Sequence, residues 1–141
     1  MTGTVADARE AAPQSASPRG VLVVDDEPTL LQMLEIALRQ HGFTVWTASS
    51  GQEAVEVLRR HQPDIQLVLL DVLMPGLDGP QTLQKLRTVD PQVRCCFMSG
   101  STGKYSEKDL IGFGAVGVLR KPFSLVEVAG TLRGMVDEES K

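Results

Sequence analysis

The sequence predicts an α/β fold, with a doubly wound parallel sheet of five strands and five helices on its two faces. Amphipathic helical patterns alternate with short apolar segments, five times along the chain. Apolar runs of this length, bounded by polar or turn residues, are typical of strands buried on both faces of a parallel sheet. The four continuous runs are GVLVV (20–24), IQLVLL (65–70), VRCCFM (93–98) and AVGVL (115–119).

The first half of the domain consists of two strand–helix units. GVLVV leads into a helix that has Pro28 in its first turn. FTVWTA (43–48) alternates threonines with apolar residues, as an edge strand does, and Ser50 and Glu53 are expected to open the next helix as a capping box. The apolar faces of these helices contain Leu30, Leu31, Leu34, Ala37 and Leu38 in the first, and Ala54, Val57 and Leu58 in the second.

Three further units follow. The third strand precedes a helix that Asp78 is expected to cap, and the fourth precedes a helix after Ser106 that glycines flank and weaken. The fifth strand precedes the last helix, which Ser124 and Glu127 are expected to cap. The apolar faces of the third and last helices contain Thr82, Leu83 and Leu86, and Leu125, Val128, Ala129, Leu132 and Val136, respectively.

Length and composition are those of one globular domain. The chain has 141 residues, with 42% hydrophobic and 23% charged residues. Residues 1–19 are rich in Ala, Ser and Pro and are expected to be a disordered leader, residues 20–137 the folded domain, and residues 138–141 a solvated tail. The sequence leaves open whether this is a complete single-domain protein or part of a larger one.

Charge and hydropathy exclude several classes of protein. A net charge of −4 argues against a nucleic-acid-binding surface, which needs clustered Lys and Arg. No apolar run is long enough for a membrane span, and the N-terminus lacks the pattern of a secretory signal. Cys95 and Cys96 are adjacent, which suits packing on opposite faces of a strand better than a disulfide. We therefore expect a reduced, cytoplasmic protein with no membrane or nucleic-acid contact.

Three acids follow two of the predicted strands. Asp25 and Asp26 close the first strand in VVDDEP, and Asp71 closes the third. A flavodoxin-like strand order, 2-1-3-4-5, makes these strands neighbours, so the three carboxylates are expected to converge at the carboxyl edge of the sheet. Like charges this close repel, and either protons or a cation must relieve the repulsion. Oxygen ligands of this kind suit Mg²⁺.

Two more strand ends complete the candidate site. Ser99 ends the fourth strand in FMSG, and Lys121 follows the fifth in LRKPF. A hydroxyl and an ammonium that face an aspartate and a divalent cation are the groups needed to hold a phosphoryl group. Phosphoryl transfer requires in-line placement and charge neutralisation, and little else from the protein.

The motifs VVDDEP, VLLDVLMPGLDG, FMSG and LRKPF, in this order and at these separations, resemble those of the CheY-like receiver domains of two-component response regulators. The resemblance runs from about Val21 to Met135. It implies that Asp71 is the phospho-acceptor and that Ser99 and Lys121 bind the phosphoryl group. It also implies a cis peptide bond between Lys121 and Pro122.

The same resemblance implies a Mg²⁺ site. Asp26 corresponds to the main metal-ligating acid of the family, and Asp25 assists it directly or through water. Asp71 and the carbonyl of Leu73 complete the ligand set. The implied function is a signalling switch that takes its phosphoryl group from a histidine kinase or a histidine phosphotransfer protein. Such a domain catalyses only its own phosphorylation and dephosphorylation, so it is not an enzyme in the usual sense.

The kinase and the downstream partner are not specified by the sequence, and a homodimer through the fourth helix and fifth strand is an open possibility. One departure from the family is Val118, three residues before Lys121, where many receivers carry Tyr or Phe. Valine is too small and too restricted to act as a ring switch. We therefore expect phosphorylation to order residues 100–114, which contain Tyr105, instead.

Three other functions are weighed against this interpretation. A phosphate-independent interaction module usually lacks one of the key residues, and all are present here. A Mg²⁺-dependent phosphohydrolase with an aspartyl-phosphate intermediate usually has an Asp-x-Asp pattern after the first strand, where this chain has VVDDEP. An FMN-binding protein needs a phosphate-binding loop at that position, and Asp-Asp-Glu repels phosphate. An acidic pair alone more often caps a helix, and it is Asp71 on the neighbouring strand that favours a joint site.

Overall fold

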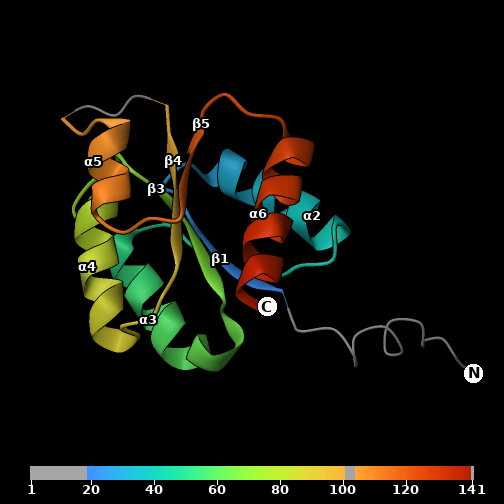
Figure 1. Cartoon of the computed structure of the whole chain (residues 1–141), viewed down its shortest axis with the longest axis horizontal. Coiled ribbons are helices and arrows are strands. Elements are labelled where there is room, and N and C mark those ends of the chain that lie inside the picture. Colours follow the sequence, from blue (N-terminus) through green and yellow to red (C-terminus); the bar gives the residue numbers. More distant parts are fainter. Residues whose placement is uncertain (1–18, 101–103, 141) are drawn as a thin grey trace, which may run out of the picture.

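The computed structural model describes residues 19–100 and 104–140. Five parallel strands form one sheet in the order β2-β1-β3-β4-β5, which confirms the predicted topology (Figure 1). Each predicted run overlaps a strand, although every strand after β1 begins one or two residues later than its run and β3, β4 and β5 end one residue beyond it. The strands are β1 (Gly20–Val24), β2 (Thr44–Ala48), β3 (Leu67–Asp71), β4 (Cys95–Ser99) and β5 (Gly117–Arg120).

Five α-helices cover the two faces of the sheet within the described part of the chain. One face carries α2 and α6, and the other carries α3, α4 and α5 (Figure 1). A short 3-10 helix, η1 (Gln62–Asp64), leads into β3. The α-helices are α2 (Pro28–Gln40), α3 (Gly51–His61), α4 (Gly79–Val89), α5 (Glu107–Gly112) and α6 (Leu125–Ser140).

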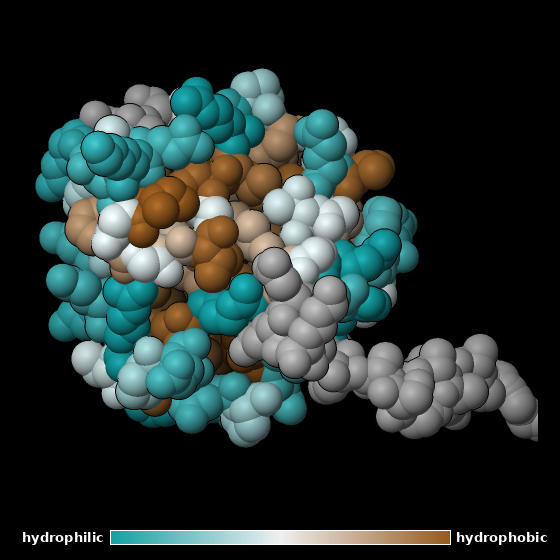
Figure 2. Space-filling model, viewed as in Figure 1, coloured by the Kyte–Doolittle hydropathy of each residue, from teal (hydrophilic) through white to brown (hydrophobic). Residues whose placement is uncertain are grey.

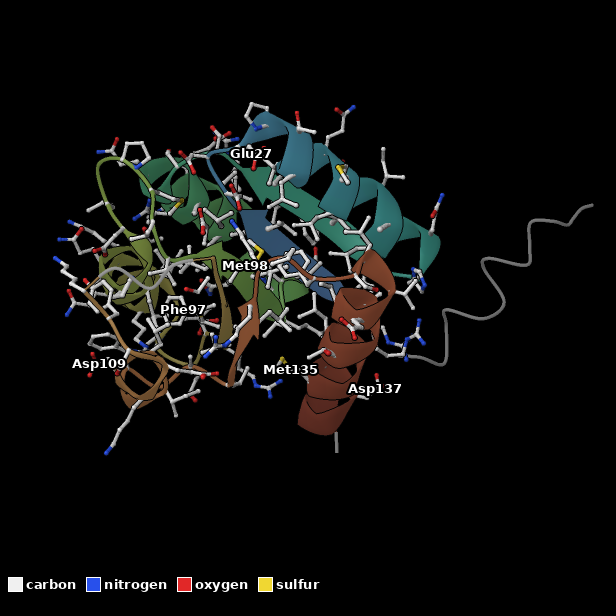
Figure 3. All side chains as sticks on the ribbon, turned by 90° about the horizontal axis from the view of Figure 1, so that it is seen from above. Glu27, Phe97, Met98, Asp109, Met135 and Asp137 are labelled. Carbon is white, nitrogen blue, oxygen red and sulfur yellow. The ribbon has the colours of Figure 1, made fainter. Side chains whose placement is uncertain are left out.

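The sheet separates two hydrophobic cores. Consecutive residues of a strand point to opposite faces, so Phe97 packs in the core under α3 to α5 and Met98 in the core under α2 and α6 (Figure 3). Every residue of β1, β3 and β4 is buried. Burial of each large apolar side chain contributes about 1.5–3 kcal/mol. Cys95 and Cys96 are free and buried, one in each core, as their packing interpretation predicts.

The predicted N-caps Ser50, Asp78 and Ser124 each accept a backbone N–H of their helix, but the capping boxes predicted with Glu53 and Glu127 show only the serine half. Asp78 forms a complete capping box with Gln81, and the hydroxyl of Ser124 accepts a hydrogen bond from the N–H of Glu127. The predicted box of Ser50 and Glu53 is only half formed. The hydroxyl of Ser50 accepts the N–H of Glu53, but the Glu53 carboxylate accepts bonds from the N–H and hydroxyl of Ser49. Two donors on one residue hold that carboxylate away from the Ser50 backbone.

Both ends of the domain are fixed to the fold. Arg19, which the sequence assigns to the leader, accepts the N–H of Thr44 on its carbonyl and pairs with Asp137 through its guanidinium at 3.1 Å. The backbone of α6 continues to Ser140, into the range assigned to the solvated tail, because Asp-Glu-Glu is compatible with helix. The rest of the predicted leader lies outside the described residues. No helix of the described chain has the length and apolar character of a membrane span.

Candidate functional site

Strand register brings the predicted site residues to one edge of the sheet. Val24 of β1 pairs with Leu70 of β3, so the residues that follow them, Asp25 and Asp71, emerge side by side. Asp71 in turn pairs with Met98 of β4, next to Ser99. Ser99 pairs with Arg120, which places Lys121 immediately beyond the end of β5. The parallel arrangement therefore gathers four strand ends into one site.

The apolar run before Asp71 fixes the position of its carboxylate. Leu67 to Leu70 are fully buried in β3, which has neighbouring strands on both sides. Asp71 itself is only 5% exposed. A strand packed on both faces has no freedom to slide by a residue without moving its whole side-chain pattern. The run thus holds a charged group at a fixed, nearly buried point of the edge.

Three carboxylates converge there, as the sequence predicts. One oxygen from each of Asp25, Asp26 and Asp71 lies within 4.8 Å of the others. Asp25 is fully buried, whereas Asp26 is exposed. The Oδ1 atom of Asp25 accepts a 2.8 Å hydrogen bond from the N–H of Glu27, which fixes its orientation at the start of α2 (Figure 3 labels Glu27). The cluster combines two anchored carboxylates with one that solvent and ligands reach.

Lys121 links these acids to the end of β5. Its Nζ atom donates hydrogen bonds to Oδ2 of Asp25 at 3.1 Å and to Oδ1 of Asp71 at 3.2 Å. Its backbone N–H donates to the carbonyl of Ser99 at 2.9 Å, and the Lys121–Pro122 peptide bond is cis, as the resemblance implies. One ammonium therefore bridges two carboxylates, one directly after β1 and one at the end of β3.

Burial and charge perturb the titration of this site. Burial, reinforced by the charge of Asp25, raises the pKa of Asp71 to about 6, even though Lys121 acts in the opposite direction. Burial lowers the pKa of Lys121, but hydrogen bonds and charge from Asp25 and Asp71 outweigh it, so the net pKa is raised. Lys121 is therefore protonated at neutral pH, and one ammonium does not fully neutralise three acids. The remaining negative charge would attract a further cation.

Ser99 contributes a hydroxyl that has no partner. The residue is 5% exposed, and its Oγ atom makes no hydrogen bond in the described structure. A buried hydroxyl without a partner is unfavourable by roughly 1–3 kcal/mol. The hydroxyl follows directly after the residue that pairs with Asp71, so a ligand with acceptor oxygens at this edge would satisfy it. An anionic group bound to Asp71 meets that description.

The loop from β3 to α4 packs tightly against Asp71. The N–H of Gly79 donates to the carbonyl of Val72 at 2.8 Å, and a Cβ atom at Gly79 would lie 2.7 Å from the carbonyl oxygen of Asp71. Only glycine fits at this distance. Leu73, whose carbonyl the resemblance assigns to the metal, lies in this loop with an exposed side chain, and its ligand role stays a prediction.

One contact near the site was not predicted. The hydroxyl of Tyr105 donates a 2.8 Å hydrogen bond to Oδ2 of Asp78, the residue that caps α4. Asp78 was expected to be a cap, which it is, but the sequence gives no signal that pairs it with a residue 27 positions away. The contact ties the segment after β4 to the loop between β3 and α4, which follows Asp71.

Comparison with known proteins agrees with this arrangement. The chain is 40% identical over 122 residues to the probable transcriptional regulatory protein TcrX of Mycobacterium tuberculosis, covering 84% of this chain and 50% of that protein. It is 29% identical to sporulation initiation phosphotransferase F of Bacillus subtilis, covering 80% of this chain and 90% of that protein. The chain spans about half the length, or less, of several curated relatives that it matches.

Solved structures share the fold. The chain superposes with a TM-score of 0.78 and 29% identity on a chain of the CheX-CheY-BeF3-Mg+2 complex from Borrelia burgdorferi, covering 86% of this chain and 92% of that one. Residues 21–133 match the family described as the response regulator receiver domain. The chain therefore belongs to the response regulator receiver domains, the phosphorylation-controlled signalling domains of two-component systems.

Proposed function

We propose that this domain accepts a phosphoryl group from a phospho-histidine donor onto Asp71, and that the aspartyl phosphate changes which partner the domain binds. The observation that carries the proposal is the unpartnered, buried hydroxyl of Ser99 at the edge where Lys121 holds the carboxylate of Asp71. The acid is fixed, a cation is in place, and a donor hydroxyl is free. Together they form a receptor for a phosphoryl group.

The proposed step is a transfer between two nucleophiles. An oxygen of the Asp71 carboxylate forms a bond to phosphorus as the bond from phosphorus to the donor histidine nitrogen breaks. The nitrogen keeps the electron pair of that bond, and the donor leaves as a histidine side chain. Lys121 pairs with the phosphoryl oxygens, and the hydroxyl of Ser99 donates a hydrogen bond to one of them. The protein contributes mainly position and charge.

The residues present fit a Mg²⁺ ion. Asp25, Asp26 and Asp71 supply hard oxygen ligands within 4.8 Å of one another, and the carbonyl of Leu73 is the proposed fourth protein ligand. When bound, Mg²⁺ neutralises negative charge on the carboxylates and the incoming phosphoryl oxygens. Asp26 is exposed, which suits an ion that retains water molecules.

Two comparisons support the proposal. The Borrelia burgdorferi structure is described as a complex with BeF3 and Mg+2, and this chain is similar to it over most of its length. The Bacillus subtilis relative is named a phosphotransferase, and this chain covers 90% of it. We infer that the donor here is a sensor histidine kinase or a histidine phosphotransfer protein. The domain would then catalyse its own phosphorylation and dephosphorylation only.

The exposed apolar surface near α5 and β5 supports a further, finer proposal about partners. Ile111, Phe113 and Val116 are 47%, 39% and 38% exposed. Hydrophobic side chains gather on this face of the molecule, over β5 and between α5 and α6 (Figure 2). We propose that two copies of the chain associate through the α5–β5 region when phosphorylated. Sedimentation with and without a phosphoryl mimic tests this, and an unchanged monomer would contradict it.

A phosphorylation time course tests the main proposal. The full chain is incubated with acetyl phosphate, with Mg²⁺ or with EDTA, and the intact mass is followed together with the release of inorganic phosphate. We expect one added phosphoryl group and no addition in EDTA. Inorganic phosphate should be released at the rate at which the adduct decays, and no faster. No adduct under any condition would favour a phosphate-independent interaction module. Rapid turnover of many small phosphate esters would favour a phosphohydrolase.

A further inference from the structure

The hydrogen bond between Tyr105 and Asp78 joins two segments that the proposed chemistry affects differently. Its donor lies in the connection between β4 and α5, and its acceptor is the N-cap of α4. The distance of 2.8 Å between the two oxygens is that of an ordinary O–H···O hydrogen bond. The bond is partly buried, so water competes with it only in part.

The Asp78 side of this contact is rigid. Its Oδ1 atom accepts the N–H of Gln81 at 2.9 Å, and its own N–H donates to the Gln81 side chain at 3.0 Å. This leaves Oδ2 for Tyr105. The next residue, Gly79, packs against the backbone of Asp71 with no room for a Cβ atom. A displacement of Asp78 therefore acts directly on Gly79, and through Gly79 on the backbone of Asp71.

The Tyr105 side is anchored by its ring. The ring packs edge-on to Phe113 of the loop after α5, with centroids 5.7 Å apart and planes at 81°. It also packs on the core cluster that Val118 borders, and the ammonium of Lys104 lies 5.4 Å from its centroid. In β5, Val118 stands where many receiver domains carry Tyr or Phe. Tyr105 contributes an aromatic ring to the same core.

Two polar groups at the ends of one short segment are in opposite states. Tyr105 has its hydrogen-bond partner, whereas Ser99, six residues earlier, has none. We assign this arrangement to the unphosphorylated domain, because the hydroxyl of Ser99 lacks an acceptor in it. A phosphoryl group on Asp71 would give the Ser99 hydroxyl an acceptor and would favour a different position of the β4 end. A ligand shifts an equilibrium only through contacts that differ between two states, and these two groups provide them.

We propose that the Tyr105–Asp78 hydrogen bond is a latch that stabilises the unphosphorylated conformation and that phosphorylation has to release. This inference rests on the proposed phosphorylation of Asp71 and adds a regulator of that site. It replaces the expectation that phosphorylation orders the whole of residues 100–114, of which residues 101–103 lie outside the described part of the chain. Breaking the latch removes stabilisation from the resting state alone. By linkage, the domain without the latch binds a phosphoryl mimic more tightly. One hydrogen bond of this type corresponds to an increase in affinity of roughly three- to tenfold.

The test measures the affinity of the full chain for beryllofluoride in the presence of Mg²⁺. Tyr105→Phe keeps the ring that packs on Phe113 and removes only the hydroxyl. Asp78→Ser keeps a good N-cap for α4 and removes the second carboxylate oxygen. The double variant completes a thermodynamic cycle, which isolates the contact from other effects of each change. Amide hydrogen exchange over residues 104–114 reports whether the segment loosens without the mimic.

The latch predicts a three- to tenfold tighter affinity for each single variant, no further gain in the double variant, and faster exchange over residues 104–114. Unchanged or weaker binding by Tyr105→Phe would overturn it, as would fully additive effects. The parent chain and Asp71→Asn separate this inference from the proposed function. If the parent binds the mimic and Asp71→Asn does not, an unaltered Tyr105→Phe affinity refutes the latch alone. If both bind alike, or neither binds, the proposed function fails and the latch with it.

Discussion

The Nζ atom of Lys121 lies 3.2 Å from Oδ1 of Asp71, although the two residues are 50 positions apart in the chain. The same atom lies 3.1 Å from Oδ2 of Asp25, so one ammonium holds two buried carboxylates. Ammonium and carboxylate groups are individually unfavourable to bury, and this geometry makes burial of Asp71 tolerable. The pair therefore links the stability of the domain to the reactivity of the site.

Replacing Lys121 with methionine is expected to destabilise the metal-free domain. The change keeps the side-chain length but leaves Asp25 and Asp71 without their ammonium. We expect a cost of about 2–3 kcal/mol at pH 8, less than for a fully buried pair because the Lys121 side chain is 24% exposed. The loss is smaller at pH 5, because Asp71 takes up a proton there. Urea unfolding at both pH values checks this, with the exposed Lys108→Met as a matched control that changes stability by less than about 0.5 kcal/mol.

An equal loss at both pH values would mean that Lys121 acts through packing alone.

The Lys121→Met variant is also expected to accept a phosphoryl group more slowly than the parent and to respond to it more weakly. Its ammonium no longer joins the phosphoryl oxygens to β5. A parent-like change in amide exchange on phosphorylation would remove Lys121 from the coupling.

The raised pKa of Asp71 makes the stability of the metal-free domain depend on pH. Its folded-state pKa is about 6 against an ordinary value of 3.8, so the folded protein binds the proton more tightly than the unfolded chain. Stability from this group is therefore greatest at low pH and falls as the pH rises from about 4 to about 6. The fall is on the order of 2–3 kcal/mol.

The difference between the parent and Asp71→Asn isolates this contribution from other carboxylates. With EDTA present, the parent is expected to lose stability relative to Asp71→Asn between pH 4 and pH 7. Asp64→Asn, an exposed acid in η1, serves as the control and should follow the parent. A parent curve parallel to that of Asp71→Asn would show that Asp71 titrates normally.

Gly79→Ala is expected to displace the loop between β3 and α4, which follows Asp71. The new Cβ atom would lie 2.7 Å from the carbonyl oxygen of Asp71 and 2.9 Å from the Cα atom of Val72, and backbone cannot move aside cheaply. We expect a loss of about 1–3 kcal/mol and slower phosphorylation. Gly134→Ala in α6 is the matched control. It meets nothing within 4 Å and should stabilise the helix by about 0.5–1 kcal/mol. Similar effects from both would contradict the packing argument.

Mg²⁺ is expected to stabilise the folded domain through the acidic cluster. A tenfold excess over its dissociation constant raises the unfolding free energy by about 1.4 kcal/mol. Asp26→Asn removes the exposed ligand without disturbing the ion pairs of Lys121, and it should weaken this response markedly. Thermal unfolding with and without Mg²⁺ measures it. An Asp26→Asn response equal to that of the parent would place the ion elsewhere.

The fold and the main site residues follow from sequence because they depend on local patterns. Buried strands require continuous apolar runs, and β3 places Asp71 at its end for that reason. Parallel order then gathers Asp25, Asp71, Ser99 and Lys121 without further information. Short-range caps such as Asp78 with Gln81 are predictable because spacing alone determines them.

Contacts of side chains that have several possible partners do not follow from sequence spacing. Glu53 had two donors within reach on Ser49 as well as the Ser50 backbone, and only the three-dimensional geometry decides between them. The bond from Tyr105 to Asp78 depends on how the segment after β4 packs, which no spacing rule encodes. The missing partner of Ser99 is likewise a property of the packed edge.

The most direct test of the account is to locate the phosphoryl group within the chain. The domain is phosphorylated with acetyl phosphate and Mg²⁺, the aspartyl phosphate is reduced with borohydride, and the modified residue is identified by peptide mass spectrometry. The account predicts modification of Asp71 alone, with none on Asp25 or Asp26 and none in Asp71→Asn. Modification of Asp25 or Asp26 in the parent, or undiminished labelling of Asp71→Asn, would contradict it.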